Sequence, residues 1–162
     1  MSTNSAHQNR WAIGEVVFGI PLLTGILLQR LAPAPLPFAL PQIFLTAAGI
    51  TLSLAGVGLM LAARRELARY YQPTDPGAPT TALVQTGPYA LSRNPLYLAA
   101  ALLFSGVALI LNNLWAVGAL LLALFLCHCL LILPEERYLA AKFGADYTAY
   151  VATVHRWVGR KL

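Results

Sequence analysis

Apolar residues fill four long stretches of the chain, and polar residues are concentrated between them. The stretches cover approximately residues 11–31, 39–63, 95–111 and 114–133. Charged residues occur within them only near the ends of the first stretch. An α-helix needs about 20 apolar residues to cross the hydrocarbon of a bilayer, with about 17 as the lower limit. The pattern therefore predicts an all-α bundle of four membrane-spanning helices.

The third and fourth stretches belong to one run without charged residues, which Asn112-Asn113 divides. A single helix over the whole run would be far too long for a bilayer, even when tilted. The two asparagines therefore predict a tight turn between antiparallel helices. This hairpin would bring residues 93 and 135 to the same depth.

Composition supports a membrane protein. Of the 162 residues, 58% are hydrophobic and only 10% are charged, whereas a soluble domain has about a quarter of its residues charged. So short a chain has no water-facing core that could bury so much apolar surface. The formal charge of +5 is spread over the ends of the apolar stretches, so nucleic acid is a poor candidate partner and the bilayer a good one.

The basic residues predict the orientation. With a cytoplasmic N-terminus, ten of the eleven lysines and arginines fall on the cytoplasmic side, and only Arg30 faces the other way. The ten are Arg10, Arg64, Arg65, Arg69, Arg93, Arg137, Lys142, Arg156, Arg160 and Lys161. Both termini are therefore expected in the cytoplasm, with the inner membrane of a bacterium as the expected location.

Two cytoplasmic segments complete this single membrane domain of residues 1–162: a loop over residues 64–94 and a cap over residues 134–162. In the cap, Pro134 suits the first turn of a helix, and the acidic pair Glu135-Glu136 favours a helix N-terminus. Gly144 is expected to break that helix. Aromatic and β-branched residues then recur at helical spacing from Tyr147 to Val158, which predicts a second helix on the membrane surface or against the bundle.

The polar residues around the third and fourth stretches are the candidate chemistry. Arg93 and Asn94 precede Pro95, which fits the first turn of a helix. Taken alone, Arg93 is interpreted as a membrane anchor, and nearby tyrosines as part of an aromatic belt. Glu135 and Glu136 change this interpretation, because acids and an arginine at one depth can pair or hold a zwitterionic ligand.

Two other motifs have structural explanations. The glycines of "AGVG" at residues 55–58 lie inside an apolar stretch with no preceding strand, so close helix packing is favoured over nucleotide binding. Cys127 and Cys129 would point to roughly opposite sides of a helix, since each residue turns it by about 100°, so core packing is favoured over a metal site. No metal is expected.

The segments "LVQTGPYALSRNPLYL" at residues 83–98 and "PEERYLAAKFGADYTAYVATVHRWV" at residues 134–158 flank an uncharged helical hairpin. This ordered set resembles the isoprenylcysteine carboxyl methyltransferase and phospholipid methyltransferase superfamily. The family pattern is Arg-His-Pro-x-Tyr or Arg-Asn-Pro-x-Tyr, a hydrophobic hairpin and a Glu-Glu pair. The resemblance covers approximately residues 64–158.

The resemblance implies S-adenosylmethionine as cofactor, bound at the cytoplasmic end of the bundle under the cap. By position, the implied cofactor contacts are Gln85, Thr86, Gly87, Tyr89, Asn94, Tyr97 and Glu135 or Glu136. The implied catalytic residues are Arg93, Glu135 and Glu136. Arg156 is a candidate to hold a carboxylate of the substrate or cofactor. Asn94 replaces a histidine of the family and is not a proton acceptor near neutral pH, so it is expected to bind rather than act as a base.

The resemblance leaves the methyl acceptor open among oxygen, nitrogen and sulfur nucleophiles. A lipid-like or apolar acceptor entering from the membrane is expected. A carboxylate acceptor would need only positioning and exclusion of water, whereas an amine must lose a proton, which makes Glu135 or Glu136 a candidate base. Two other functions remain possible: a sterol-reductase-like oxidoreductase using NADPH, and a non-enzymatic membrane subunit or small transporter.

Overall fold

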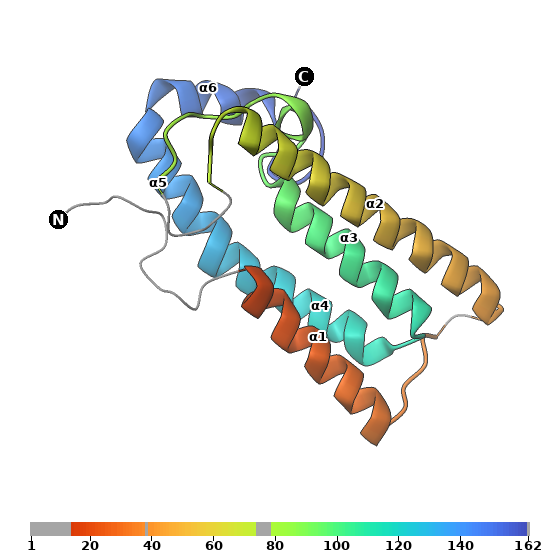
Figure 1. Cartoon of the computed structure of the whole chain (residues 1–162). Coiled ribbons are helices and arrows are strands. Elements are labelled where there is room, and N and C mark those ends of the chain that lie inside the picture. The colour runs from red at the N-terminus through yellow and green to blue at the C-terminus, as the bar shows by residue number, and fades with distance from the viewer. Residues whose placement is uncertain (1–13, 38, 74–78, 162) are drawn as a thin grey trace.

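The computed structural model describes residues 14–37, 39–73 and 79–161, and over these residues the protein is all-α (Figure 1). The α-helices are α1 (Gly14–Leu31), α2 (Gln42–Arg69), α3 (Pro95–Ile110), α4 (Leu114–Cys127), α5 (Leu133–Phe143) and α6 (Ala145–Thr153). A 3-10 turn, η1 (Gly87–Ala90), precedes α3, and a π turn, η2 (His128–Ile132), joins α4 to α5 in one continuous helix. The chain thus has five separate helices in its described part.

Four of these helices coincide with the four predicted apolar stretches. By length and composition, α2 and the helix from Leu114 to Phe143 could cross a membrane, and α1 and α3 are shorter apolar helices. Residues 11–13 of the first predicted span lie outside the described residues. The predicted turn is also confirmed: Asn112 has a positive φ of 46°, and the side chain of Asn113 accepts a hydrogen bond from the Ala116 amide at 3.0 Å.

Helix α2 is longer than predicted. Its first turn begins at Gln42 instead of Ala39, and it ends at Arg69 instead of Ala63. The sequence "RRELAR" ends the apolar stretch but consists of good helix formers, so the charges change the surroundings of the helix without stopping it. The loop predicted over residues 64–94 therefore begins only at Tyr70, and its residues 74–78 lie outside the described part.

Pro134 lies in the first turn of α5, as predicted, but α5 continues from α4 through the π turn instead of starting as a separate helix. A proline inside a helix lacks an amide donor, and its ring clashes with the carbonyl one turn earlier. Here the π turn immediately before it widens the helix, and the Leu133 amide donates to the carbonyl of His128, five residues back. The wider turn accommodates the proline, so the chain continues as a helix. The apolar part of this helix ends with the π turn, and the charged α5 extends beyond it.

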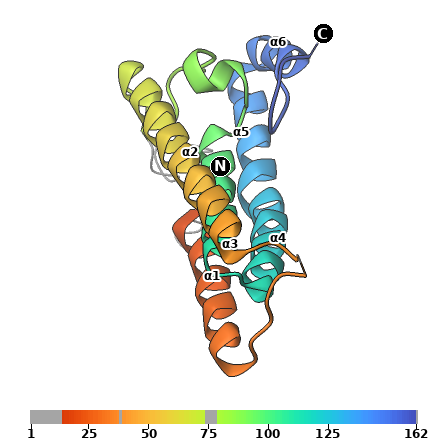
Figure 2. The same cartoon turned by 90° about the vertical axis from the view of Figure 1, so that its right-hand side faces the viewer.

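The bundle is built from two helix pairs, with α1 along α4 and α2 along α3 (Figures 1 and 2). Glycines bring α2 and α3 into backbone contact. A Cβ atom on Gly56 would lie 2.7 Å from the Ala99 carbonyl oxygen, whereas a Cβ atom on Gly58 would meet nothing within 4 Å. The interpretation of "AGVG" as a helix-packing motif is confirmed for Gly56.

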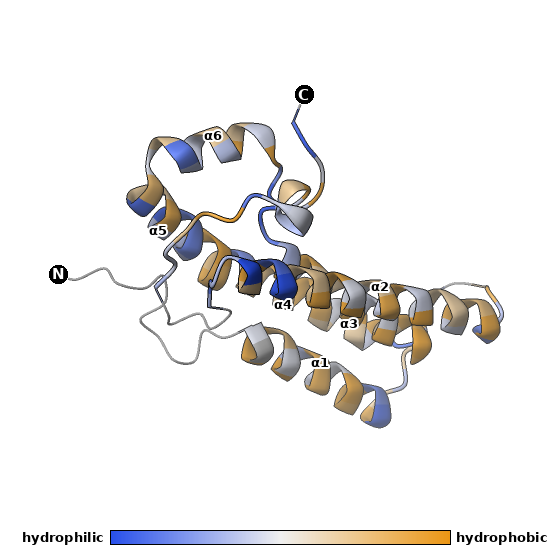
Figure 3. Ribbon diagram, turned by 45° about the horizontal axis from the view of Figure 1, so that its top comes forward, coloured by the Kyte–Doolittle hydropathy of each residue, from blue (hydrophilic) through white to orange (hydrophobic). Residues whose placement is uncertain are grey.

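Apolar side chains cover the outside of the bundle. Figure 3 shows hydrophobic residues along α1 to α4 and polar ones gathered toward one end, around α5, α6 and the C-terminus. Leu23, Ile43 and Phe125 each expose more than 60% of their surface. Water would disfavour so large an apolar surface, whereas lipid would not. The helices therefore have the surface of a membrane protein.

The cap covers the polar end of the bundle. Gly144, with a φ of +52°, forms the corner between α5 and α6, as predicted. The second cap helix is shorter than predicted, because α6 ends at Thr153 and the chain turns back on itself. An isolated bridge joins Val154 to Arg160, and Gly159 allows the turn with a φ of +102°. We call residues 154–160 the C-terminal hairpin; backbone hydrogen bonds join it to Leu91 and Arg93, in the segment between η1 and α3.

Candidate functional site

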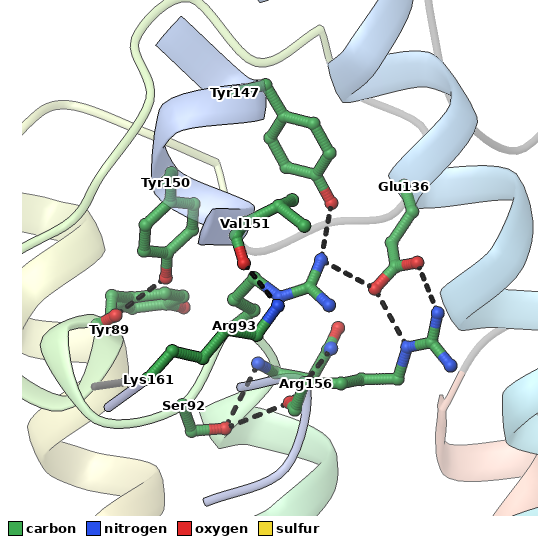
Figure 4. Close-up of polar contacts among 10 residues, drawn as sticks. Tyr89, Ser92, Arg93, Glu136, Tyr147, Tyr150, Val151, Arg156 and Lys161 are labelled. Carbon is green, nitrogen blue, oxygen red and sulfur yellow. Dashed lines mark hydrogen bonds and ion pairs between the residues drawn. The ribbon is translucent and has the colours of Figure 1, made fainter. Parts of the chain in front are cut away.

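An ion-pair network joins three segments that are distant in sequence. Glu136 of α5 binds Arg156 through two hydrogen bonds, of 2.9 Å to Nε and 2.7 Å to Nη2. The same carboxylate lies 3.0 Å from Nη1 of Arg93. Figure 4 shows both guanidinium groups converging on it. The predicted association of Arg93 with the acidic pair is confirmed, and its partner is Glu136.

The network is largely shielded from water. The side chain of Arg93 is only 9% exposed, that of Glu136 is 17% exposed and that of Arg156 is 33% exposed. Two cations thus share one carboxylate in a region of low effective dielectric. The hydrogen bonds that Arg156 donates to Glu136 raise the pKa of the Arg156 guanidinium above its ordinary value, so this guanidinium stays charged.

Glu135 occupies a different environment from its neighbour. It is half-buried, and one carboxylate oxygen accepts a hydrogen bond of 3.3 Å from the Tyr97 hydroxyl. Within the described residues no cation lies within ion-pair distance of it. Burial raises the pKa of this carboxyl from 4.5 to about 7, and the Tyr97 hydrogen bond opposes the shift only partly. Glu135 can therefore exchange a proton near neutral pH.

Aromatic side chains enclose the network on the side of α6 (Figure 4). Arg93 Nη1 donates to the Tyr147 hydroxyl at 3.2 Å, and the Tyr150 hydroxyl donates to the Tyr89 carbonyl at 2.6 Å. Burial raises the pKa of Tyr89, Tyr147 and Tyr150, so these phenols remain protonated. The helical spacing that predicted α6 therefore also placed two of its tyrosines over the site.

One polar atom at the centre of the site lacks a partner. Nε of Arg93 is buried and makes no hydrogen bond within the part of the chain that the structure describes. Buried polar atoms are rarely unpaired in folded proteins, so an unpaired one at a candidate site is a possible ligand contact. Figure 4 shows this guanidinium between Tyr147 and Glu136.

Asn94 does not face the acidic pair. It is buried, and its side-chain amide donates to the backbone carbonyl of Arg156 at 3.2 Å. The Ser92 hydroxyl donates to the same carbonyl at 3.3 Å. The sequence predicted a ligand-binding role for Asn94; the structure places its side chain against the C-terminal hairpin.

The predicted contacts Thr86 and Gly87 lie next to a carboxylate that sequence reasoning missed. Glu66 of α2 is 7% exposed. Its carboxylate accepts a hydrogen bond from the Thr86 hydroxyl and forms an ion pair of 3.2 Å with Arg69. Gly87 has a φ of +58°, and a Cβ atom there would lie 3.0 Å from Cδ of Glu66. An acid in the last turns of a helix is electrostatically unfavourable, and this was the available signal in "RRELAR".

Gln85 lies apart from the network, on a groove beside α6. The groove has a volume of about 530 Å³ and is lined by Leu83, Gln85, Phe143, Asp146, Ala149, Tyr150 and Thr153. Tyr150 also lines this groove, and its hydroxyl donates to the Tyr89 carbonyl. The structure thus separates the predicted site residues. Arg93, Glu136 and Arg156 form the network, and Glu135 pairs with Tyr97 beside it. Thr86 and Gly87 contact Glu66, Asn94 contacts the hairpin, and Gln85 lines this groove.

Cys127 has a packing role. Cys127 is fully buried in a cluster with Phe18, Leu131 and Ile132, and Cys129 is partly buried. Among the described residues, no three His, Cys, Asp or Glu side chains gather as a metal site would require.

Comparison with known proteins identifies the family. Residues 44–146 match the family model described as phospholipid methyltransferase. Over 94 residues the chain is 34% identical to the cobalt-zinc-cadmium resistance protein CzcN of Cupriavidus metallidurans. The match covers 58% of this chain and 42% of that relative, so the chain spans less than half the length of the curated protein it matches. No solved structure matches. The family model covers well over half of the chain, including α3, α4 and the acidic pair, and the protein therefore belongs to the phospholipid methyltransferase family.

Proposed function

We propose that this protein is an integral membrane methyltransferase that uses S-adenosylmethionine to methylate an apolar or lipid-like acceptor. The observation that carries the proposal is the joining of Arg93, Glu136 and Arg156 directly beside Glu135, at the polar end of an apolar bundle. An intramembrane or interfacial cluster of ionisable residues is a functional site by default.

The membrane arrangement belongs to the same proposal. All four apolar helices cross the bilayer, both termini lie in the cytoplasm and the cap lies over the cytoplasmic end. The placement of ten of the eleven basic residues supports this orientation. The acceptor then reaches the site from the bilayer, while the cofactor reaches it from water.

The residues present suit the cofactor, which carries a carboxylate, an ammonium group and a sulfonium centre. The free Nε of Arg93 is a donor for a carboxylate. Among the residues that the structure describes, the carboxylate of Glu135 accepts one hydrogen bond, from Tyr97, and it retains capacity for a cationic group. The groove of about 530 Å³ that Gln85 and Tyr150 line has the volume of a small-molecule site, about 300–1,000 Å³, but it is a separate surface whose lining includes neither Arg93 nor Glu135.

When bound, the cofactor supplies a methyl group on a sulfonium cation. The chain's own residues then position the reactants and exclude water. Arg93 and Glu136 are fixed in position, because Arg93 is bound to Tyr147 and Glu136 is bound to Arg156. Tyr147 and Tyr150 cover the site from the side of the cap. Positioning and dehydration of this kind account for much of the rate enhancement in group transfer.

The role of Glu135 depends on the acceptor. An amine acceptor must release a proton, and Glu135, with a pKa of about 7, is matched to take it near neutral pH. A carboxylate acceptor has no proton to release, and Glu135 would then only position groups. The family match to phospholipid methyltransferases favours the amine as the acceptor.

Two measurements on purified protein in detergent test the proposal. First, S-adenosylmethionine and S-adenosylhomocysteine should raise the thermal midpoint, because a ligand of the folded state stabilises it by mass action. Stabilisation by NADPH alone would favour the reductase alternative, and no response to any of these ligands would favour a non-enzymatic subunit.

Second, radiolabelled methyl groups should pass from the cofactor into a membrane lipid extract. Arg93→Ala and Glu135→Gln should abolish this transfer in protein that remains folded. Full activity in either variant would overturn the assignment of the site.

A further inference from the structure

We propose that Asn94 is a positioning residue: by holding the backbone carbonyl of Arg156, it fixes the Arg156 guanidinium on Glu136. The inference rests on the proposed function and adds a role for a residue that contacts neither of the acids. It also assigns the C-terminal hairpin a part in completing the site.

Asn94 is directed at the hairpin by its own surroundings. It stands at the N-cap position of α3, yet its side chain makes no capping hydrogen bond. Its Nδ2 atom donates to the Arg156 carbonyl instead, at 3.2 Å. Asn94 is only 7% exposed, so this amide has few alternative partners. Asparagine is a favoured helix cap, so a buried N-cap asparagine that binds the Arg156 carbonyl instead is interpreted as holding that carbonyl in place.

Ser92 reinforces the same contact. Its hydroxyl donates a hydrogen bond to the Arg156 carbonyl at 3.3 Å and accepts one from the backbone amide of Asn94 at 3.1 Å. Two donors therefore converge on one oxygen, and they are also linked to each other. This convergence fixes the backbone of Arg156 more strictly than a single hydrogen bond would.

Arg156 needs this support because it lies outside any helix. Its segment is the bend of the C-terminal hairpin, between Val154 and Arg160. Two backbone hydrogen bonds hold the hairpin beside the same loop: the Arg93 amide donates to the His155 carbonyl at 3.1 Å, and the Gly159 amide donates to the Leu91 carbonyl at 2.7 Å. Neither of these two bonds involves the Arg156 peptide carbonyl, which is held by Asn94 and Ser92.

The consequence concerns the charges of the site. Arg156 binds Glu136 with both Nε and Nη2, a two-point geometry that tolerates little displacement of the backbone. Without the Arg156 contact, Glu136 would pair with Arg93 alone, and the network beside Glu135 would lose its second cation. Asn94 and Arg156 therefore act as one unit. A displacement of the Arg156 guanidinium by about 1 Å can lower the rate of methyl transfer about 100-fold.

A double-mutant cycle tests this coupling. Asn94→Leu keeps the size of the side chain and removes its hydrogen bonds, and Arg156→Met keeps the aliphatic stem of the arginine and removes its charge. Each single variant should lower kcat/KM for methyl transfer by about 10- to 100-fold. The double variant should be no worse than Arg156→Met alone, because coupled residues are not additive. Multiplied losses would show that Asn94 contacts a ligand independently and would overturn the proposal.

Rescue and control variants complete the design. Asn94→His retains an N–H donor and should restore most of the activity that Asn94→Leu loses; failure to restore it counts against the donor role. Lys161→Met removes a 2.6 Å hydrogen bond to the Val151 carbonyl beside the same hairpin without touching Arg156. It should behave as wild type, and a loss equal to that of Asn94→Leu would indicate a general loosening of the cap.

The same cycle on thermal midpoints separates this inference from the proposed function. The combination of Asn94→Leu with Glu136→Gln should be less destabilising than the sum of the two, because both weaken the same ion pair. This measurement needs no methyl acceptor. Additive thermal shifts would overturn the positioning role even in an active enzyme, and coupled shifts in an inactive protein would support it while the function failed.

Discussion

Glu135 and Glu136 are adjacent and chemically identical, yet the structure predicts opposite consequences for the same isosteric change. Glu136→Gln should destabilise the fold, whereas Glu135→Gln should leave stability nearly unchanged and abolish activity. The reason is the number of charges that each carboxylate compensates. Glu136 lies within 3.0 Å of two guanidinium groups, and Glu135 accepts one hydrogen bond of 3.3 Å from a neutral phenol.

The magnitude follows from burial. Removing one partner of a buried ion pair costs about 3–5 kcal/mol, because the other charge is left uncompensated. That full cost applies to Arg93, which is 9% exposed, but not to Arg156, which is 33% exposed and can be solvated in part. Glutamine also keeps one oxygen acceptor. We therefore expect a loss of about 2–3 kcal/mol for Glu136→Gln. For Glu135→Gln we expect a loss of at most about 1 kcal/mol, from one weakened hydrogen bond, and no loss near neutral pH, where the change also removes a buried carboxylate that has begun to ionise.

Thermal unfolding in mild detergent measures the difference. For a chain of this size, 1 kcal/mol shifts the midpoint by about 2–4 °C, so Glu136→Gln should lower it by about 4–12 °C. Adding Arg93→Met to Glu136→Gln should recover part of this loss, because it removes the uncompensated buried charge. The reasoning is refuted if Glu136→Gln unfolds at the wild-type temperature, or if Glu135→Gln falls by as much.

Two further predictions concern helix packing and pH. Gly56→Ala should destabilise the bundle, because its Cβ atom would lie 2.7 Å from the Ala99 carbonyl oxygen; the matched control Gly58→Ala meets nothing within 4 Å and should be neutral or slightly stabilising in the same thermal assay. Because the pKa of Glu135 rises from 4.5 to about 7 on folding, the folded state binds a proton that the unfolded chain releases between these values. The free energy of unfolding should therefore fall as pH rises from about 4.5 to 7 and then level off, and Glu135→Gln should lack this component; a Glu135→Gln protein with the wild-type pH dependence would contradict the shift. With an amine acceptor, kcat should rise through the same pKa of about 7 in the wild type.

The apolar pattern predicted the four apolar helices and their order because lipid-facing helices leave a continuous signal in the sequence. It failed at Arg69 and Pro134, where helices continue beyond the apolar residues. Hydropathy reports the surroundings of a helix, and hydrogen bonding decides where the helix ends. The π turn at residues 128–132 shows the difference, because Pro134 is a strong helix-breaking signal whose effect is cancelled by the turn immediately before it.

The candidate site was predictable in its members and not in their pairing. The hairpin argument correctly placed Arg93 beside the acidic pair, since antiparallel helices bring their ends to one depth. Whether Arg93 meets Glu135 or Glu136 depends on the rotation of α5, and the π turn, which changes the number of residues per turn, acts on that rotation directly. The position of Glu66 at the end of a helix left a signal in "RRELAR", but its contact with Thr86 did not, and neither did the contact of Asn94 with the Arg156 carbonyl. Both contacts are defined only by what packs against them. The assignment of Asn94 to positioning rather than binding follows from this same level of structure: a sequence can show that a residue has lost the ability to act as a base, but only the fold shows which oxygen its amide holds.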